Sequence, residues 1–245
     1  MIGSRIEVPP RLNGPAGSGQ GGYSCGLVAT LVGNPAEVTL RAPVPLGRPL
    51  SVDQLADGGV AVRDGGTLIA EGRRVESLDL DVPDPPSIDE AEEASVGYAS
   101  PREIFAHCFV CGSEREDGQR VFPAGVAGRD LVASTWSPRD EWLAADGVVR
   151  PEFIWAVLDC PTYFASALER PRMLAVLGRL TVELLASIRI GEPHVVMSWP
   201  LESQGRKHPA GCAVASAEGE LLAVGRGLHL EVSEVPSPPA PSASR

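Results

Sequence analysis

Apolar side chains recur at helical spacing in two stretches of the chain. In residues 20–33 (QGGYSCGLVATLVG) they recur every three or four positions, and a Gly-Asn-Pro sequence ends the pattern. Residues 150–165 (RPEFIWAVLDCPTYFA) repeat this spacing over a broader apolar face. Pro151 and Glu152 suit the first turn of a helix, since proline lacks an N–H and the helix start is positive. The two stretches predict two buried helices.

One residue breaks the apolar pattern of the second predicted helix. Asp159 directly follows Val157 and Leu158, two turns into the helix. A carboxylate in an apolar helix interior is costly unless it is paired or used. Asp159 is therefore either bonded locally, for example to Thr162 or to an arginine, or it has a chemical role.

Shorter patterns of alternating apolar and polar residues predict strands after each helix. Between the two groups of strands, an acidic and proline-rich segment reads as a linker, and Ser87 and Glu90 fit a capping box for a short helix at 87–95. The expected strands and hairpins lie at 36–52, 58–64, 67–76, 120–138, 180–190, 194–200, 210–216 and 220–232.

The order of a helix followed by strands occurs twice, which indicates an internal repeat. Residues 44–52 (VPLGRPLSV) parallel residues 188–196 (IRIGEPHVV). We expect an α+β fold with two antiparallel sheets, each wrapped around a central helix. The expected boundaries are 1–82 for the first unit, 83–106 for the linker, 107–234 for the second unit and 235–245 for a disordered tail.

On these features the chain resembles the double hotdog proteins of the thioesterase superfamily and is similar to the PaaI-like acyl-CoA thioesterases. In that family the central helix begins with His-Gly-Gly and carries an Asp or Glu eight positions after the first Gly. The second predicted helix keeps the acid as Asp159 and lacks this start. The first keeps Gly21 and Gly22, with Gln20 in place of the histidine and Ala29 at the acid position. The resemblance implies a tandem (double) hotdog that hydrolyses acyl thioesters.

Helix geometry restricts how such a site can be assembled. Eight helical residues span about 12 Å, so helix-start amides and an acid eight positions later cannot reach one carbonyl from the same helix. Two antiparallel helices are needed, and we expect the Gly21-Gly22 end of the first to face Asp159 of the second. The reciprocal pairing has no chemistry, because Pro151 lacks an N–H and Ala29 is not a base. One site per chain is predicted.

The expected mechanism is hydrolysis of a thioester, with acyl-CoA as the expected substrate. The amides of Gly22 and Tyr23 would hold the thioester oxygen, with Gln20 as a further donor. Asp159 would activate water as a general base or attack directly to give an anhydride, and the sequence leaves both routes open.

Other residues are candidates for substrate binding. The bulky side chains of Trp155 and Tyr163 either line an acyl pocket or belong to the core. Arg206 and Lys207 suit the phosphates of coenzyme A, although a solvated hairpin turn explains them as well.

Charge and apolar patterning exclude several function classes. The formal net charge of -11 argues against nucleic-acid binding. We see no signal peptide and no apolar run long enough to span a membrane. Five cysteines without a dense framework suggest reduced thiols and a cytoplasmic protein. A homodimer paired through its sheets is a further possibility.

The cysteines themselves are interpreted as packing residues. Cys108 and Cys111 form a CxxC motif, but structural zinc sites usually use two such pairs, and no second pair exists. Cys25 and Cys160 lie on the two predicted helices without an obvious histidine base. We therefore expect no metal and no cofactor.

Two other functions stay open at this stage. Hotdog hydratases and dehydratases use an Asp with a His five positions later, where this chain has Phe164. A non-catalytic acyl-binding protein is the third possibility, because the first helix lacks the acid and the helix-start histidine.

Overall fold

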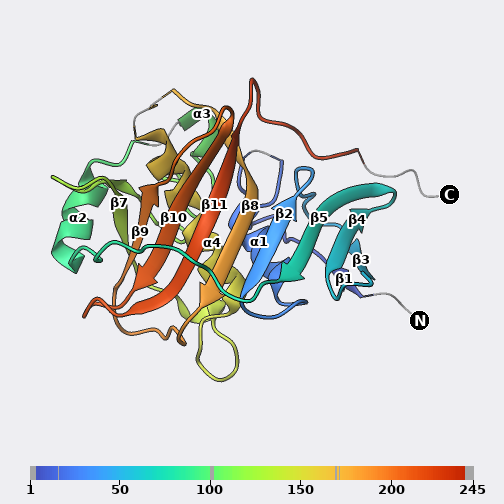
Figure 1. Cartoon of the computed structure of the whole chain (residues 1–245), viewed down its shortest axis with the longest axis horizontal. Helices are drawn as coiled ribbons and strands as arrows, with labels where there is room; N and C mark the ends of the chain where they lie inside the picture. The colour runs from blue at the N-terminus through green and yellow to red at the C-terminus, as the bar shows by residue number, and fades with distance from the viewer. Residues whose placement is uncertain (1–3, 16, 100–101, 169, 171, 241–245) are drawn as a thin grey trace.

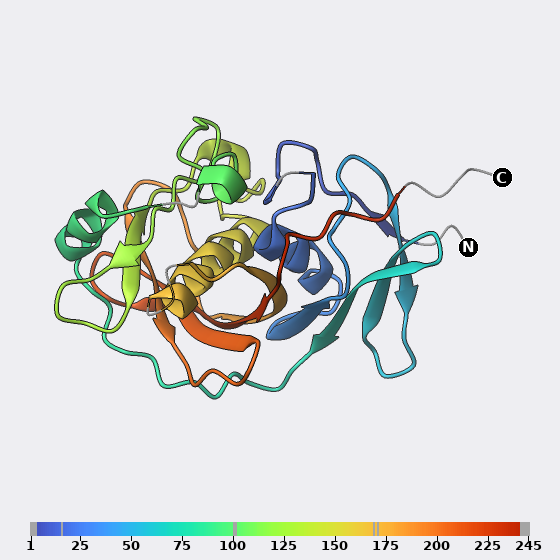
Figure 2. The same cartoon turned by 90° about the horizontal axis from the view of Figure 1, so that it is seen from above.

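The computed structural model of the chain describes residues 4–15, 17–99, 102–168, 170 and 172–240 (Figure 1). In this part of the chain, eleven antiparallel strands form one sheet, and two helices lie side by side against one of its faces (Figure 2). The expected α+β class is confirmed. None of the described helices combines the length and hydropathy needed to cross a bilayer.

The elements fall into an earlier and a later group along the chain. The earlier group contains β1 (Arg5–Ile6), α1 (Gly21–Ala29), β2 (Ala36–Leu40), β3 (Leu50–Gln54), β4 (Val60–Asp64) and β5 (Thr67–Arg74). The later group contains α2 (Ile88–Val96), α3 (Arg102–Phe105), β6 (Ala124–Gly125), β7 (Val132–Trp136), the 3-10 helix η1 (Asp140–Trp142), α4 (Pro151–Ala167), β8 (Ala175–Leu184), β9 (His194–Pro200), β10 (Lys207–Ala215) and β11 (Leu221–Glu231).

The sheet is continuous because β2 pairs with β8. Their register places Ala36 opposite Val182 and Thr39 opposite Arg179. Outward from this junction the strand order is β2, β5, β4, β3 on one side and β8, β11, β10, β9 on the other. Counted from β2 and from β8, the strands that follow α1 and α4, each side therefore continues with its fourth, third and second strand in turn. The sequence predicted two sheets, whereas pairing of their edges removes two exposed strand edges and gives one sheet.

Helices α1 and α4 pack unusually closely because α1 carries glycine at the contact. A Cβ atom at Gly22 would lie 2.4 Å from the carbonyl oxygen of Trp155. A Cβ at Gly26 would lie 2.5 Å from the Cα of Glu152. Residue numbers rise along α1 as they fall along α4, so the helices run antiparallel, as the sequence predicted.

Several predicted elements are confirmed with small shifts at their ends. The predicted capping box is present, with the Glu90 N–H donating to Ser87 Oγ and the Ser87 N–H donating to the Glu90 carboxylate. Strand β8 begins five residues before the start and ends six residues before the end of the strand predicted at 180–190, which is a larger shift. Gly178 obscured this start, because glycine is unfavourable within strands. Here it makes room for Leu230, whose Cδ1 would lie 2.8 Å from a Cβ at that position.

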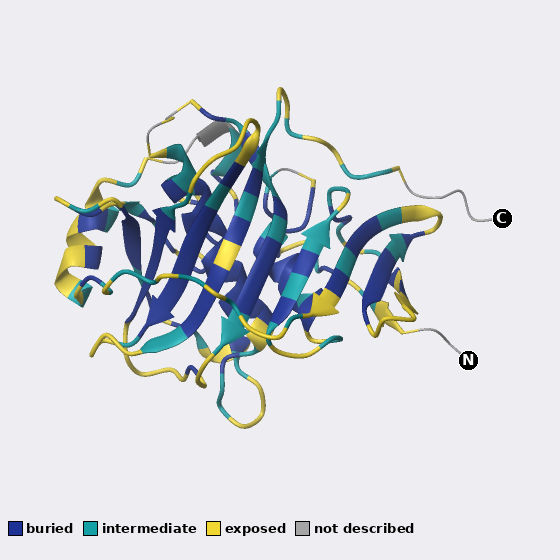
Figure 3. Ribbon diagram, viewed as in Figure 1, coloured by how far each residue is buried: buried dark blue, intermediate teal, exposed yellow. Residues whose placement is uncertain are grey.

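The segment between β5 and α2 crosses the face of the sheet opposite α1 and α4 (Figure 1). Its apolar side chains Leu78, Leu80 and Val82 pack against buried residues that include Val195 and Met197 of β9. The central strands are therefore buried over much of their length, while exposure concentrates at turns and outer segments (Figure 3). The segment therefore covers one face of the sheet, and α1 and α4 cover the other.

Candidate active site

Asp159 lies in the interior of α4 and faces the start of α1. Asp159 is buried, with 6% of its surface exposed. Oδ2 of the carboxylate accepts hydrogen bonds from the Gly22 N–H at 2.8 Å and from Gln20 Nε2 at 2.7 Å. The acid of one helix is thus held by the amino-terminal end of the other, where backbone N–H groups and the helix dipole favour negative charge.

Gln20 connects this carboxylate to the cap of α1. Its Oε1 accepts the Tyr23 N–H at 2.6 Å, as an N-cap side chain does. This bond orients the side-chain amide, so that its Nε2 points at Asp159. Gln20 is 1% exposed, and the two bonds fix both ends of its amide group.

Burial dominates the electrostatics of Asp159. Loss of solvation raises the pKa of this carboxyl from 3.8 to about 7. The Gly22 N–H and the Gln20 amide oppose the rise by stabilising the charged form, while negative charge at Cys108 adds to it. The carboxyl is thus far more basic than an exposed aspartate.

His229 of β11 approaches the other carboxylate oxygen. Its Nε2 lies 3.9 Å from Asp159 Oδ1 and 2.8 Å from Thr162 Oγ1. The single hydroxyl hydrogen of Thr162 goes to the carbonyl oxygen of Asp159 at 2.6 Å, so Nε2 of His229 is the donor to Thr162. Burial lowers the pKa of His229 to about 3 and keeps the ring neutral. Its Nδ1 is left as a buried acceptor without a partner among the described residues.

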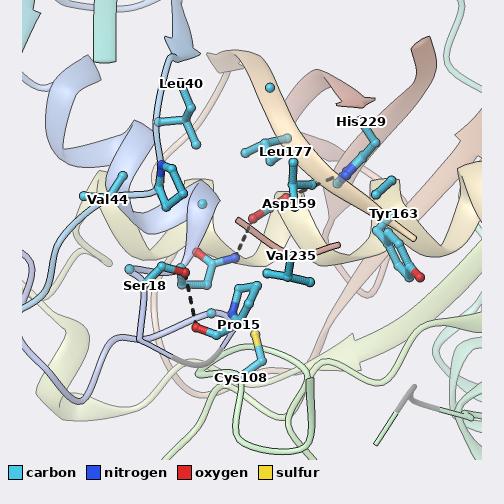
Figure 4. A pocket seen from close by; sticks show the side chains of 18 of the residues that line it. Pro15, Ser18, Leu40, Val44, Cys108, Asp159, Tyr163, Leu177, His229 and Val235 are labelled. Carbon is cyan, nitrogen blue, oxygen red and sulfur yellow. Dashed lines mark hydrogen bonds and ion pairs between the residues drawn. The ribbon is translucent and has the colours of Figure 1, made fainter. Parts of the chain in front are cut away.

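A largely apolar cavity of about 270 Å³ opens onto these groups (Figure 4). Its walls come from both the earlier and the later group of elements. The loop before α1 and strand β2 form one side, and α4, β8 and β11 form the other. Apolar lining residues include Leu40, Val44, Phe105, Leu177 and Leu230.

Two polar groups at this cavity, one donor and one acceptor, form no hydrogen bond with any described residue. Gly21 lines the cavity, and its N–H has no hydrogen-bond partner in the described part of the chain. Oδ1 of Asp159 likewise accepts no hydrogen bond from any described residue. The site therefore presents one free helix-start donor and one free carboxylate oxygen next to an apolar space.

The reciprocal position between the helices has no comparable groups. Ala29 stands at the position equivalent to the acid, and α4 begins with Pro151, which has no N–H to offer. Glu152 is buried there, with its Oε1 3.4 Å from Arg150 Nη1.

Comparisons with solved structures identify the architecture. The tesB protein MAP1729c of Mycobacterium avium subsp. paratuberculosis is 14% identical, with 93% of this chain and 92% of that chain covered at a TM-score of 0.60. A conserved protein of unknown function with a hot dog fold from Alicyclobacillus acidocaldarius is 13% identical, with 94% and 93% covered at a TM-score of 0.61. The fold is the hotdog fold.

A third similar structure carries a functional description. It is a Novosphingobium aromaticivorans protein provisionally described as a thioesterase, 16% identical, with 92% of this chain and 94% of that chain covered at a TM-score of 0.60. No protein-family model matches the sequence, and no curated protein matches it either. At such identities the likeness establishes the hotdog fold, and the activity has to be argued from the site.

The hotdog fold brings together only some of the residues that the sequence suggested. Gln20, Gly21, Asp159 and Tyr163 line the cavity, and Gly22 contacts the carboxylate directly. Tyr163 donates its hydroxyl to the Met173 carbonyl at 2.7 Å and presents its ring to the cavity.

Four other predicted site residues lie outside the cavity lining. The Tyr23 N–H is used by Gln20, and burial of its phenol raises the pKa of Tyr23 to about 12. Trp155 is buried in the helix contact with α1. Arg206 and Lys207 are exposed at the turn between β9 and β10, and neither belongs to the cavity lining, although Lys207 pairs across the sheet with the lining residue Leu230.

Sequence reasoning missed three sets of residues that shape the site. His229 and Leu177 come from strands far along the chain, and their sequence gives no sign of proximity to Asp159. Val235 and Pro236 line the cavity, although they belong to the segment expected to be a disordered tail. Arg48 Nη2 also donates to the Pro239 carbonyl at 2.6 Å, and residues 241–245 of that tail lie outside the described residues. The third set is the cysteine cluster described below.

Proposed function

We propose that this protein hydrolyses an acyl thioester, with an acyl-CoA as substrate, at a single site between α1 and α4. One observation carries the proposal. A buried aspartate faces the amino-terminal end of a helix from the other half of the chain, at the floor of an apolar cavity. A thioester needs these three features together, namely a base or nucleophile, an oxyanion donor and an apolar space for the acyl chain.

The roles follow from which atoms are free. The Gly21 N–H donates a hydrogen bond to the thioester oxygen as it becomes negative, helped by the positive end of α1. Oδ1 of Asp159 takes a proton from water, the hydroxide adds to the thioester carbon, and the tetrahedral adduct expels the thiolate of coenzyme A. The thiolate then takes up the proton. Gly22 and Gln20 hold Oδ2 and so fix the direction of Oδ1.

Direct attack by Asp159 is the alternative route for the same atoms. Oδ1 would form an anhydride with the acyl group and release the thiol, and water would then cleave the anhydride. Repeated turnover in ¹⁸O water tests for the anhydride, because label enters the Asp159 carboxyl only when an anhydride forms and water attacks its aspartyl carbonyl carbon. The label is located by peptide mass spectrometry.

The proposal includes a tandem arrangement of two hotdog units in one chain. Its support is the matching strand order on the two sides of the β2–β8 junction, each side with its own helix. In this arrangement the second unit supplies Asp159, the first supplies the helix start, and the reciprocal position at Ala29 is inactive. One substrate per chain is expected.

His229 favours a second candidate function, the addition of water to an enoyl thioester. Hydratases of this fold pair an aspartate with a histidine on the same helix, where this chain has Phe164. The structure supplies an imidazole from β11 instead, with Nε2 3.9 Å from Asp159 Oδ1. Hydration adds the mass of water to the thioester, whereas hydrolysis releases free coenzyme A.

The test is a panel of acyl-CoA substrates that includes saturated, aryl and 2-enoyl thioesters. Products are separated by chromatography and identified by mass. Release of coenzyme A from at least one substrate supports the proposal. Hydrated enoyl-CoA without released coenzyme A supports the second candidate and contradicts thioesterase activity. Binding without any conversion across the panel contradicts both.

A further inference from the structure

Three cysteines meet in the wall of the same cavity, and the proposed hydrolysis does not use them. Cys108 and Cys111 lie in the loop after α3, and Cys160 lies on α4 next to Asp159. Their Sγ atoms all lie within 4.8 Å of one another, and those of Cys108 and Cys160 are 3.8 Å apart. All three are buried (Figure 4 shows Cys108 at the cavity).

The loop is folded tightly so that its two thiols converge. The Gly112 N–H donates to the Cys108 carbonyl at 2.9 Å, which closes the loop after the second cysteine. A Cβ at Gly112 would lie 2.5 Å from that carbonyl oxygen, so glycine is required for this turn. The Phe109 N–H donates to the Asn13 carbonyl at 2.8 Å and ties the loop to the segment before α1.

The sulfur spacing fits metal coordination. Zinc binds thiolate sulfur at about 2.3 Å, so two sulfurs of a tetrahedral site lie about 3.8 Å apart. The Cys108–Cys160 pair has this separation, and the other two pairs are compatible with small side-chain rotations. From the sequence we expected no metal site, because the chain has no second CxxC pair. The structure changes that argument, because Cys160 from a distant helix provides the third ligand.

We propose that Cys108, Cys111 and Cys160 form a zinc site with three thiolate ligands and a fourth position open to the cavity. The open position follows from the surroundings, since all three cysteines line the cavity together with Asp159. Sites with three protein ligands leave the fourth place to water or to a bound molecule. The site also joins the loop at 108–112 to α4, so the ion stabilises this wall of the cavity.

The proposal is tested on the full-length protein purified without chelators. Elemental analysis is expected to find about one zinc per chain, and less than about a tenth of that in Cys111→Ala and Cys160→Ala. Cys25→Ala is the matched control, because Cys25 is buried on α1 outside the cluster, and it is expected to keep its zinc. Cobalt(II) loaded into the wild-type protein in place of zinc is expected to show thiolate-to-metal charge-transfer bands and the ligand-field bands of a tetrahedral site.

Several results would overturn the proposal. These are wild-type protein that takes up no zinc from an equimolar solution, cobalt bound without thiolate bands, copper in place of zinc, and a disulfide among the three cysteines in the protein as purified under reducing conditions. Equal zinc in the wild type and in both cluster variants would also contradict it. Because the cobalt spectrum is measured on the wild type, misfolding of a variant does not remove the test. Metal content is independent of thioester turnover, so this inference can fail while the proposed function stands.

Discussion

The backbone N–H of Gly22 donates to Oδ2 of Asp159 at 2.8 Å, across 137 residues of sequence. This bond fixes how α1 and α4 pass each other, and it sets the direction of the free carboxylate oxygen. It depends on the absence of a side chain at Gly22, since a Cβ there would lie 2.6 Å from the Cβ of Asp159. Close helix packing and the candidate chemistry therefore have the same structural origin.

Replacing Gly22 by alanine tests this dependence. The new methyl group would clash with the Trp155 carbonyl and with Asp159, and relief requires the helices to separate. We expect the free energy of unfolding to fall by about 1–3 kcal/mol, measured by urea denaturation. Gly66→Ala is the control, because nothing lies within 4 Å of a Cβ at Gly66. Equal stability of the two variants would contradict this prediction, because it would show that the contact between α1 and α4 accommodates a methyl group at position 22.

Replacing Gln20 by alanine removes a donor to Asp159 and the cap of α1. The carboxylate loses one of its two hydrogen bonds, and the Tyr23 N–H loses its partner. We expect a loss of about 0.5–2 kcal/mol in stability from the missing cap. We also expect kcat for a responsive acyl-CoA to fall about tenfold or more, because the direction of Oδ1 is less well fixed.

Ser87→Ala provides the comparison for Gln20→Ala. Ser87 caps α2 and lies outside the cavity lining, so its loss affects a helix cap without touching Asp159. If Gln20→Ala loses stability as Ser87→Ala does but keeps its kcat, Gln20 acts only as the cap of α1.

Val235→Asp tests whether the segment after β11 forms a wall of the substrate cavity. Val235 lines the cavity beside apolar residues, and a carboxylate there opposes binding of an acyl chain. We expect kcat/KM for acyl-CoA to fall about tenfold or more, mainly through KM. Val96→Asp is the matched control, since Val96 is 88% exposed at the end of α2. Equal kinetics of the two variants would place the acyl chain elsewhere.

Much of the hotdog fold was accessible from the sequence because its main signals are local. Helical spacing located α1 and α4, and alternating apolar residues at 58–64 and 67–76 located the hairpin of β4 and β5. The pairing of β2 with β8 is not local, so two sheets were expected where there is one. The irregular segment at 137–149 contains η1, whose three residues give no periodic pattern.

The candidate site was only partly predictable for the same reason. A carboxylate in an apolar helix and a glycine pair at a helix start are visible in the sequence, and antiparallel packing was deduced from helix length. The assignment of Gly22 as the oxyanion donor changes, because its N–H is already bonded to Asp159 while that of Gly21 is free. His229 and the convergence of Cys160 with Cys108 depend on long-range folding, and no sequence spacing indicates them.

The proposed hydrolysis depends most directly on Asp159 as the group that activates water or attacks the thioester. The decisive measurement is the single-turnover rate of the best acyl-CoA substrate with the wild type, Asp159→Asn and Glu152→Gln. Glu152 is a second buried carboxylate on α4 and lies outside the cavity lining. We predict a loss of at least about 10²-fold for Asp159→Asn and a rate close to wild type for Glu152→Gln. An Asp159→Asn variant that folds and releases coenzyme A as fast as the wild type would contradict the account.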